Sequence, residues 1–337
     1  MKKAMYYKKT DDGAVQCLLC PHNCIIKKDR VGICRNRKNI DGTLYSLNYG
    51  KVSSVGIDPI EKKPLYNFYP GSNILSLGTL GCNLSCDFCQ NWSISQASCD
   101  GSVRDVEDLS CKEAVDAALK YKDSGNIGIA YTYNEPFIWY EYVYETSQLV
   151  KKKGLNNVLV TNGFVNEEPL KEILPFIDAA NIDLKAMNDD FYKKLCHGRL
   201  EPVLNTCRIM NDSCLIELTN LIITGRNDSK EDIMKLVDWV YDNLGKDTPL
   251  HFSRYRPEYK MKEPPTSMEA LDFAYEYASK KLSYVYVGNI YKEEWSDTFC
   301  PKCKSIVIKR GYMGTDEINI KNGNECTKCL YKLNIIS

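Results

Sequence analysis

From residue 72 onward, short apolar runs alternate with longer segments of helical periodicity, and this alternation restricts the fold more than any other feature of the chain. Strands are predicted at residues 74–80, 127–133, 157–161, 180–184, 214–223, 249–254 and 283–288. Helices are predicted at residues 112–123, 136–153, 167–174, 188–196, 201–211, 230–244 and 267–281. This order predicts an α/β fold with a parallel sheet and right-handed crossovers, namely a partial (β/α)6 TIM-like barrel.

The first predicted strand leads directly into a loop with three cysteines, Cys82, Cys86 and Cys89, spaced C-x3-C-x2-C. Gly81 lets the chain turn as it leaves the strand, and α/β folds place their ligands at such strand ends. Three soft thiolates suit an iron–sulfur cluster or zinc. A four-iron cluster on three cysteines keeps one iron open, as catalytic metal sites do. The alternative is a zinc knuckle or a set of inert buried thiols.

The chain has 16 cysteines and no apolar segment typical of a signal peptide, so the cysteines indicate metal sites rather than disulfides. Near the N-terminus, Cys17, Cys20, Cys24 and Cys34 follow the pattern C-x2-C-x3-C-x9-C. These four thiols predict zinc or a second iron–sulfur cluster, with a structural or electron-relay role. His22 is left out of this ligand set, because four cysteines complete it.

Near the C-terminus, Cys300, Cys303, Cys326 and Cys329 form two C-x2-C knuckles with 22 residues between them. Four thiolates close the coordination shell of a metal, so a small zinc-ribbon-like knuckle is predicted, with zinc favoured over iron. The remaining cysteines are scattered and are expected to be small buried or half-buried side chains. They are Cys99, Cys111, Cys196, Cys207 and Cys214.

These features predict three parts. Residues 1–70 form a Cys-rich N-terminal extension with a wrapping loop, residues 71–292 the barrel, and residues 293–337 the C-terminal knuckle. Within the wrapping loop, the charged residues Asp58, Glu61, Lys62 and Lys63 are expected to be a solvated surface run. The aromatic segment around Trp139 is expected to fill the core rather than contact a substrate.

Polar residues recur at the ends of successive predicted strands, where barrel enzymes place their active sites. Both charge signs are present, as a zwitterionic ligand requires. The candidate residues are Asn134, Glu135, Asn162, Asp183, Lys185 and His251. The alternative for each one is an ordinary capping or salt-bridging role in a loop. No residue is predicted as a catalytic acid, base or nucleophile.

Composition excludes two classes of partner. Lys plus Arg equal Asp plus Glu at 44 each and no basic stripe occurs, so nucleic acid is not an expected partner. No run approaches the length of about 18 apolar residues that a membrane span needs. A different class of function, a zinc-stabilised binding or scaffold protein, would account for the cysteines but leaves the strand-end polar residues unexplained.

The loop Cys82–Cys89, with Phe88 before its last cysteine, resembles the signature of radical S-adenosylmethionine (radical SAM) enzymes. The resemblance implies a [4Fe-4S] cluster on Cys82, Cys86 and Cys89, with SAM bound to the fourth iron and cleaved reductively to a 5′-deoxyadenosyl radical. Asn134-Glu135-Pro136 stands where the family has a Gly-Gly-Glu-type motif, and Asp183-Leu184-Lys185 is similar to the Asp-x-Lys motif of glycyl-radical-enzyme activases. The six strand-end residues, including Asn162 and His251, are therefore expected to position SAM.

Over nearly its whole length the chain resembles the AmmeMemoRadiSam system radical SAM enzymes, which are related to pyruvate formate-lyase activating enzyme. The resemblance is carried by Cys17–Cys34, Asp58–Ser72, Gly81–Gln96, Tyr131–Pro136, His251–Arg254, Val285–Asn289 and the C-terminal cysteines. It implies an oxygen-sensitive cytoplasmic oxidoreductase, a ferredoxin- or flavodoxin-type electron donor, and association with the other components of that system. It also implies activase-like hydrogen abstraction from a partner protein, with radical modification of a small molecule as the alternative.

Overall fold

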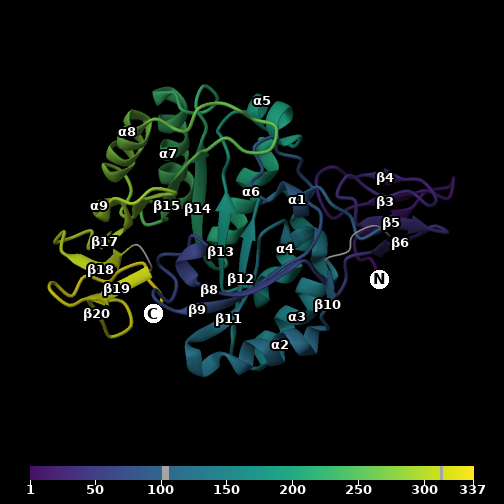
Figure 1. The fold of residues 1–337 in the computed structure, drawn as a ribbon, viewed down its shortest axis with the longest axis horizontal. Helices are drawn as coiled ribbons and strands as arrows, with labels where there is room; N and C mark the ends of the chain where they lie inside the picture. The colour runs from purple at the N-terminus through teal and green to yellow at the C-terminus, as the bar shows by residue number, and fades with distance from the viewer. Residues whose placement is uncertain (101–105, 312–313) are drawn as a thin grey trace.

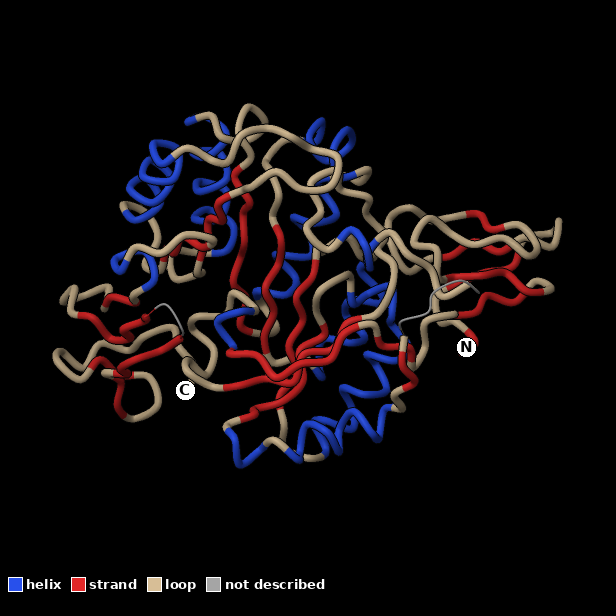
Figure 2. The backbone as a smooth tube through the Cα atoms, viewed as in Figure 1, coloured by secondary structure: helices blue, strands red, loops and turns tan. Residues whose placement is uncertain are grey.

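The computed structural model describes residues 1–100, 106–311 and 314–337, and an eight-stranded sheet lies at its centre (Figure 2). The strand order is β16-β15-β14-β13-β12-β11-β9-β8. The strands are β8 (Ser54–Pro59), β9 (Asn73–Gly78), β11 (Asn126–Tyr131), β12 (Asn156–Thr161), β13 (Ala179–Asp183), β14 (Leu215–Ile222), β15 (Leu250–Arg254) and β16 (Val285–Gly288). β9 and the strands from β11 to β16 are parallel, and β8 pairs antiparallel with β9 at the edge. The predicted partial barrel is confirmed.

Six of the seven predicted helices are the main helices between consecutive parallel strands (Figure 1). They are α2 (Cys111–Lys120), α3 (Tyr140–Lys152), α4 (Glu167–Ile173), α6 (Leu200–Asn211), α7 (Lys230–Leu244) and α8 (Met268–Ser279). The seventh, predicted at residues 188–196, is divided into the short helix α5 (Asp189–Phe191) and the π-helical turn η5 (Tyr192–Cys196). The cap of α2 is a capping box, in which the side chains of Ser110 and Glu113 each accept from the other's backbone N–H. No helix in the described part of the chain is long and apolar enough to cross a membrane.

The aromatic segment at the start of α3 belongs to the core. The short 3₁₀ turn η3 (Pro136–Trp139) begins at Pro136 and runs directly into α3. Trp139, Tyr140 and Tyr142 are at most 1% exposed. The indole nitrogen of Trp139 donates to the Asn48 carbonyl at 2.6 Å, so this helix also holds the N-terminal segment in place.

The N-terminal segment forms two small three-stranded sheets, which project to the right of the barrel in Figure 1. One sheet has the order β1-β6-β5 and the other β2-β3-β4. The strands are β1 (Lys2–Lys3), β2 (Tyr7–Lys9), β3 (Val15–Cys17), β4 (Ile25–Ile26), β5 (Arg37–Ile40) and β6 (Thr43–Ser46). A buried ion pair ties this segment to α3, because both guanidinium nitrogens of Arg37 donate to the Glu141 carboxylate, at 2.9 and 2.8 Å.

The C-terminal unit lies at the opposite end of the molecule in Figure 1 and has its own small core. Its strands are β17 (Thr298–Phe299), β18 (Ile306–Gly311), β19 (Gly314–Ile318), β20 (Ile320–Lys321) and β21 (Glu325–Cys326). The end of the chain returns to the barrel, where the backbone N–H of Ile336 donates to the Asn67 carbonyl at 2.8 Å. The backbone N–H of Asn67 donates in turn to Glu217 on β14 at 2.7 Å.

The charge run that begins at Asp58 is not the solvated surface that the sequence pattern predicts. Lys63 is only 2% exposed, and its ammonium donates to Asp58 at 2.7 Å. The hydroxyl of Tyr133 donates to the same carboxylate oxygen at 2.7 Å, and its ring lies 4.7 Å from the Lys63 ammonium. A buried lysine needs such partners. Asp58 lies five residues before Lys63 in the chain, whereas Tyr133 comes from a distant segment.

This buried pair predicts a pH dependence of stability. Burial alone would raise the pKa of Asp58, but the hydrogen bonds from Lys63 and Tyr133 outweigh burial and lower it. A carboxylate with a depressed folded-state pKa stabilises the fold above its unfolded pKa of about 3.9, and this contribution is lost as the pH falls through the folded value. Urea unfolding from pH 7 down to pH 3 is therefore expected to show a smaller loss of stability for Asp58→Asn than for wild type. Asp41→Asn, at an exposed ion pair, is the control and should titrate like wild type.

Candidate active site

The cysteine loop leaves the carboxyl end of β9 and is held from both sides. Gly81 has a φ of 89°, and its N–H donates to the carbonyl of Ile94 in α1 (Trp92–Ser95) at 2.8 Å. On the other side, the N–H groups of Ser85 and Asp87 donate to the carbonyls of Cys196 and Leu195, at 3.1 and 2.9 Å. These carbonyls belong to the π-helical turn η5 (Tyr192–Cys196). The loop is therefore fixed by backbone contacts.

A cavity of about 300 Å³ opens at the carboxyl ends of the parallel strands. This volume is near the lower bound of the usual range for small-molecule sites, about 300–1,000 Å³. Cys82, Cys86 and Cys89 line it. Four of the predicted strand-end residues line it as well, namely Asn134, Asn162, Asp183 and Lys185. The fold thus brings together a thiol group and a polar wall that are far apart in the sequence.

Asp183 and Lys185 give this wall both signs of charge. The Lys185 ammonium lies 3.0 Å from the Asp183 carboxylate, and its side chain is 13% exposed. Burial would lower the pKa of Lys185, but the negative charges of Asp183 and the Cys86 thiolate raise it well above its usual value. Lys185 is therefore a permanent cation beside the thiols.

Asn134 and Asn162 hold the cysteine loop by their side-chain amides. Asn134 donates to the Gly81 carbonyl at 2.7 Å and accepts from the N–H of Thr79 at 3.2 Å. The amide nitrogen of Asn162 donates to the Asn83 side chain at 2.9 Å and lies 3.5 Å from the Cys82 sulfur. Both residues therefore connect the loop to neighbouring strands as well as facing the cavity.

Glu135 and His251, the other two strand-end residues, are not among the residues that line the cavity. The carboxylate of Glu135 is 1% exposed and accepts from Phe137 N–H, Thr161 Oγ1 and Asn162 N–H, at 2.8 to 2.9 Å. Burial raises the pKa of Glu135 to about 7. The Glu135 carboxylate therefore accepts all three hydrogen bonds from neighbouring residues, and the bond from Asn162 orients that residue.

His251 lies deeper in the barrel than the cavity. Ser253, two residues further along β15, lines the cavity, as does Thr219, which pairs with His251 across the sheet. The Nε2 of His251 is 2.6 Å from the Glu217 carboxylate, and this histidine is 4% exposed. Both members of the pair are buried and neither lines the cavity.

Comparison with known proteins identifies the family of this chain. The sequence profile of the Radical SAM superfamily matches residues 77–240, which include the cysteine loop and most of the cavity wall. The chain belongs to the radical SAM superfamily. It is 44% identical over 340 residues, the full length of both chains, to "Uncharacterized protein MJ0808" of Methanocaldococcus jannaschii.

Two further proteins similar to this radical SAM chain are activating enzymes. Pyruvate formate-lyase 1-activating enzyme of Escherichia coli strain K12 is 27% identical over 165 residues, covering 48% of this chain and 66% of that one. A solved domain of pyruvate-formate lyase-activating enzyme from Bacteroides vulgatus has a TM-score of 0.43 and 18% identity, and covers 48% of this chain and 99% of that one.

Membership in the radical SAM superfamily implies a [4Fe-4S] cluster and SAM, and the surroundings of the three thiols fit this cluster. Cys82 accepts from the N–H of Leu84 at 3.3 Å, and Cys89 lies 3.3 Å from the Ser95 hydroxyl. A hydrogen bond from the Cys196 thiol lowers the pKa of Cys86, and Lys185 acts in the same direction. Burial raises the pKa of Cys82 and Cys89, so it is the hydrogen-bond donors and the cation around the sulfurs that favour the thiolate form, which metals bind.

Several residues around this radical SAM site belong to no motif that sequence patterns identify. Cys196 is buried, as predicted, and it also contacts Cys86. Lys260 reaches over the loop, where its ammonium and its backbone N–H contact Asp87 at 3.1 and 3.0 Å. Beside it, Tyr259 stacks on Trp92 with ring centroids 5.2 Å apart. Only the three-dimensional fold brings these side chains to the cysteine loop.

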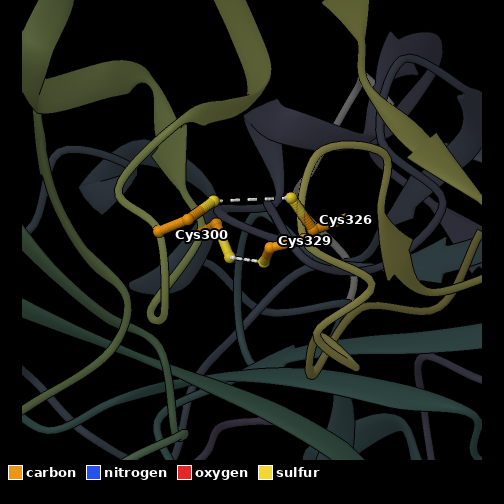
Figure 3. Close-up of side chains that lie close together, drawn as sticks. Cys300, Cys326 and Cys329 are labelled. Atoms are coloured by element: carbon orange, nitrogen blue, oxygen red, sulfur yellow. Dashed lines mark hydrogen bonds between the residues drawn. The ribbon is translucent and has the colours of Figure 1, made fainter.

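The C-terminal cysteines form a second candidate metal site (Figure 3). Cys300 and Cys329 have their sulfurs 3.6 Å apart, and those of Cys303 and Cys326 are 3.8 Å apart. All four sulfurs lie within 4.8 Å of one another, so the set could hold a metal ion. A hydrogen bond from Ser305 lowers the pKa of Cys303 to about 6, so this thiol is mostly ionised at neutral pH.

Proposed function

We propose that this radical SAM enzyme binds SAM at a [4Fe-4S] cluster held by Cys82, Cys86 and Cys89 and abstracts hydrogen from a partner protein, as activating enzymes do. The observation that carries the proposal is the single cavity in which three thiols face a wall containing Asp183 and Lys185. When bound, the cluster and SAM would supply a 5′-deoxyadenosyl radical after one-electron reduction. The protein supplies placement and shields the reacting groups from water.

The contacts in the structure suggest a role for each strand-end residue. Asp183 and Lys185 offer opposite charges to a zwitterionic ligand, and Asn134 and Asn162 offer amide groups beside the thiols. Glu135 acts through Asn162, whose backbone N–H it accepts at 2.8 Å. His251 is a positioning residue, through its contact with Glu217.

The partner-protein substrate is supported by the similarity to pyruvate formate-lyase 1-activating enzyme. The proposal includes a ferredoxin- or flavodoxin-type electron donor and functional association with the other AmmeMemoRadiSam components. It also includes a cytoplasmic, oxygen-free setting, because a cluster with an open iron is sensitive to oxidation.

The test is anaerobic purification, iron and sulfide analysis, and reduction in the presence of SAM. Wild type is expected to be brown and to form 5′-deoxyadenosine. The triple variant Cys82→Ala, Cys86→Ala, Cys89→Ala is expected to form none, whereas Cys214→Ala, a cysteine outside all three clusters, should match wild type. Reconstituted wild type that leaves SAM intact would contradict the proposal. Hydrogen exchange from labelled SAM into small molecules, but not into protein, would favour radical modification of a small molecule instead.

Zinc is the metal we assign to the C-terminal cysteines. A tetrahedral zinc site with Zn–S distances of about 2.3 Å has sulfurs about 3.8 Å apart. The observed separations of 3.6 and 3.8 Å match this edge. Four protein ligands leave no open position, so the site stabilises the C-terminal unit rather than performing chemistry.

Removal of this metal is expected to release the C-terminal unit while the barrel stays folded. The unit buries few side chains of its own, so the metal supplies much of its stability. The double variant Cys303→Ala, Cys326→Ala should lose about one zinc per chain and become sensitive to proteolysis after residue 293. The measurement is metal analysis followed by limited trypsin digestion, with Cys214→Ala as the control. Unchanged zinc in the double variant would place the metal elsewhere.

A further inference from the structure

The N-terminal cysteines converge through backbone pairing. Cys17 ends β3, and its N–H donates to the carbonyl of Cys24 at 2.9 Å across the β3–β4 pair. Cys20 lies in the turn between these strands, closed by a bond from Asn23 N–H to the Cys20 carbonyl at 3.0 Å. Cys34 follows Gly32, at which an added Cβ would lie 3.7 Å from the Cys24 sulfur. All four cysteines are free thiols, and three of them are at most 9% exposed.

The four sulfurs lie among backbone donors. Burial raises the pKa of all four thiols, and the backbone N–H groups of Leu19, His22 and Asn36 act in the opposite direction on Cys17, Cys20 and Cys34. Each of these donors lies two residues after its cysteine, so the chain turns back toward the sulfur in the same way at three of the four positions. His22 is engaged elsewhere, with its Nε2 2.7 Å from the Asn83 carbonyl, so the four sulfurs remain as the donor set.

The separation of the sulfurs distinguishes a single zinc ion from an iron–sulfur cluster, both of which four cysteines can hold. Across the described ranges, the C-terminal set is the one group in which three or more such ligand atoms lie within 4.8 Å of one another. That set therefore serves as an internal standard for a single ion. Within those ranges, neither the N-terminal sulfurs nor those of Cys82, Cys86 and Cys89 form a group that meets this limit. Iron–sulfur clusters are larger than one ion and also take four cysteine ligands.

We propose that Cys17, Cys20, Cys24 and Cys34 hold a second iron–sulfur cluster rather than zinc. The site adjoins the active-site loop. The side chain of Asn36 donates to the Cys34 carbonyl at 3.3 Å and to the Leu80 carbonyl at 2.7 Å, just before the cysteine loop. His22 contacts the carbonyl of Asn83 inside the loop. A cluster at this position lies directly behind the loop that carries Cys82, and its assembly helps to fix that loop.

The proposal stands apart from the reaction proposed above, and its test uses metal content rather than activity. The first protein is the full chain with Cys82, Cys86 and Cys89 all changed to alanine, purified without oxygen and reconstituted with iron and sulfide. It is expected to retain about two to four irons per chain with equal sulfide. The electron paramagnetic resonance spectrum after dithionite reduction should show one cluster. Failure of SAM cleavage in wild type would leave this result unaffected.

The second protein carries the same three changes together with Cys20→Ser and Cys24→Ser, and it is expected to lose the iron and the signal. Cys214→Ser in the triple background is the matched control and should keep both. Circular dichroism of each protein identifies a variant that has failed to fold. In that case Cys24→Ser alone, at the least buried of the four positions, replaces the double change. Zinc without iron in the triple variant, or iron that survives loss of Cys20 and Cys24, would overturn the proposal.

Discussion

Replacement of Gly81 by alanine is expected to lower the free energy of unfolding by about 3–5 kcal/mol, from an αL backbone penalty added to overpacking. Gly81 has a φ of 89°, where a Cβ is strained. The new Cβ would lie 2.1 Å from the side-chain nitrogen of Asn36 and 2.6 Å from the carbonyl oxygen of Cys34. The Asn36 side chain has little freedom to move because it is buried and bonded on both sides, and the carbonyl is backbone. The overlap of the new Cβ with Asn36 and Cys34 lies where β9, the cysteine loop and the N-terminal cysteine segment meet.

Gly154→Ala is the matched control for this prediction. Gly154 has a φ of 68°, yet an added Cβ would meet nothing within 4 Å. It should therefore show only the conformational penalty, about 1–2 kcal/mol. The measurement is urea unfolding of both variants, together with the iron content of anaerobically purified protein. If the two variants lose equal stability and keep equal iron, close packing at Gly81 does not hold the loop.

The sheet could be predicted from the sequence because its signal is local. Every parallel strand coincides with an apolar run of the sequence. The observed strand ends differ from the predicted ends by two residues or fewer. The capping box at Ser110 and the helix start at Pro136 are local in the same sense, since each depends on residues within one turn. Parallel pairing then follows from the alternation of strands and helices.

The remainder of the site depends on pairings between distant residues, which a pattern along one segment does not contain. Lys63 lies in a charge run that is typical of a surface, and its burial depends on the ring and hydroxyl of Tyr133. Glu135 stands in the predicted motif, but its hydrogen bonds with Thr161 and Asn162 are not contained in that motif. Cys196 is a lone cysteine whose contact with Cys86 arises only when η5 packs on the loop. Spacing predicts the candidate metal ligands but not these neighbours.

The contacts of Glu141 also could not be predicted from the sequence, since nothing within its aromatic helix indicates a partner for this carboxylate. The pair that it forms with Arg37 spans 104 positions of the chain and is 1–2% exposed on both sides. The carboxylate also accepts from the N–H of Met5 at 2.7 Å. These three contacts place the first strands of the N-terminal segment against α3.

Breaking this ion pair from one side is expected to destabilise the protein by about 3–5 kcal/mol, because the remaining charge is left buried without its partner. Glu141→Leu and Arg37→Met should each show this loss in urea unfolding. The double variant should lose far less than the sum of the two, since two apolar side chains replace the charges. Its residual cost, about 1–3 kcal/mol, reflects the Met5 N–H that loses its acceptor.

The exposed pair of Lys171 and Glu167 provides the comparison, with side chains 60% and 55% exposed. Glu167→Gln removes a charge of the same sign from α4, and the expected loss is far smaller than that of Glu141→Leu because solvent screens the pair. Additive losses in the Arg37 and Glu141 variants would show that the two side chains do not interact in solution. A coupling of several kcal/mol would instead show that this one contact holds the N-terminal cysteine segment in register with the barrel. Since Arg37 lies three residues after Cys34, loss of the contact should also lower the iron retained at the N-terminal cysteines.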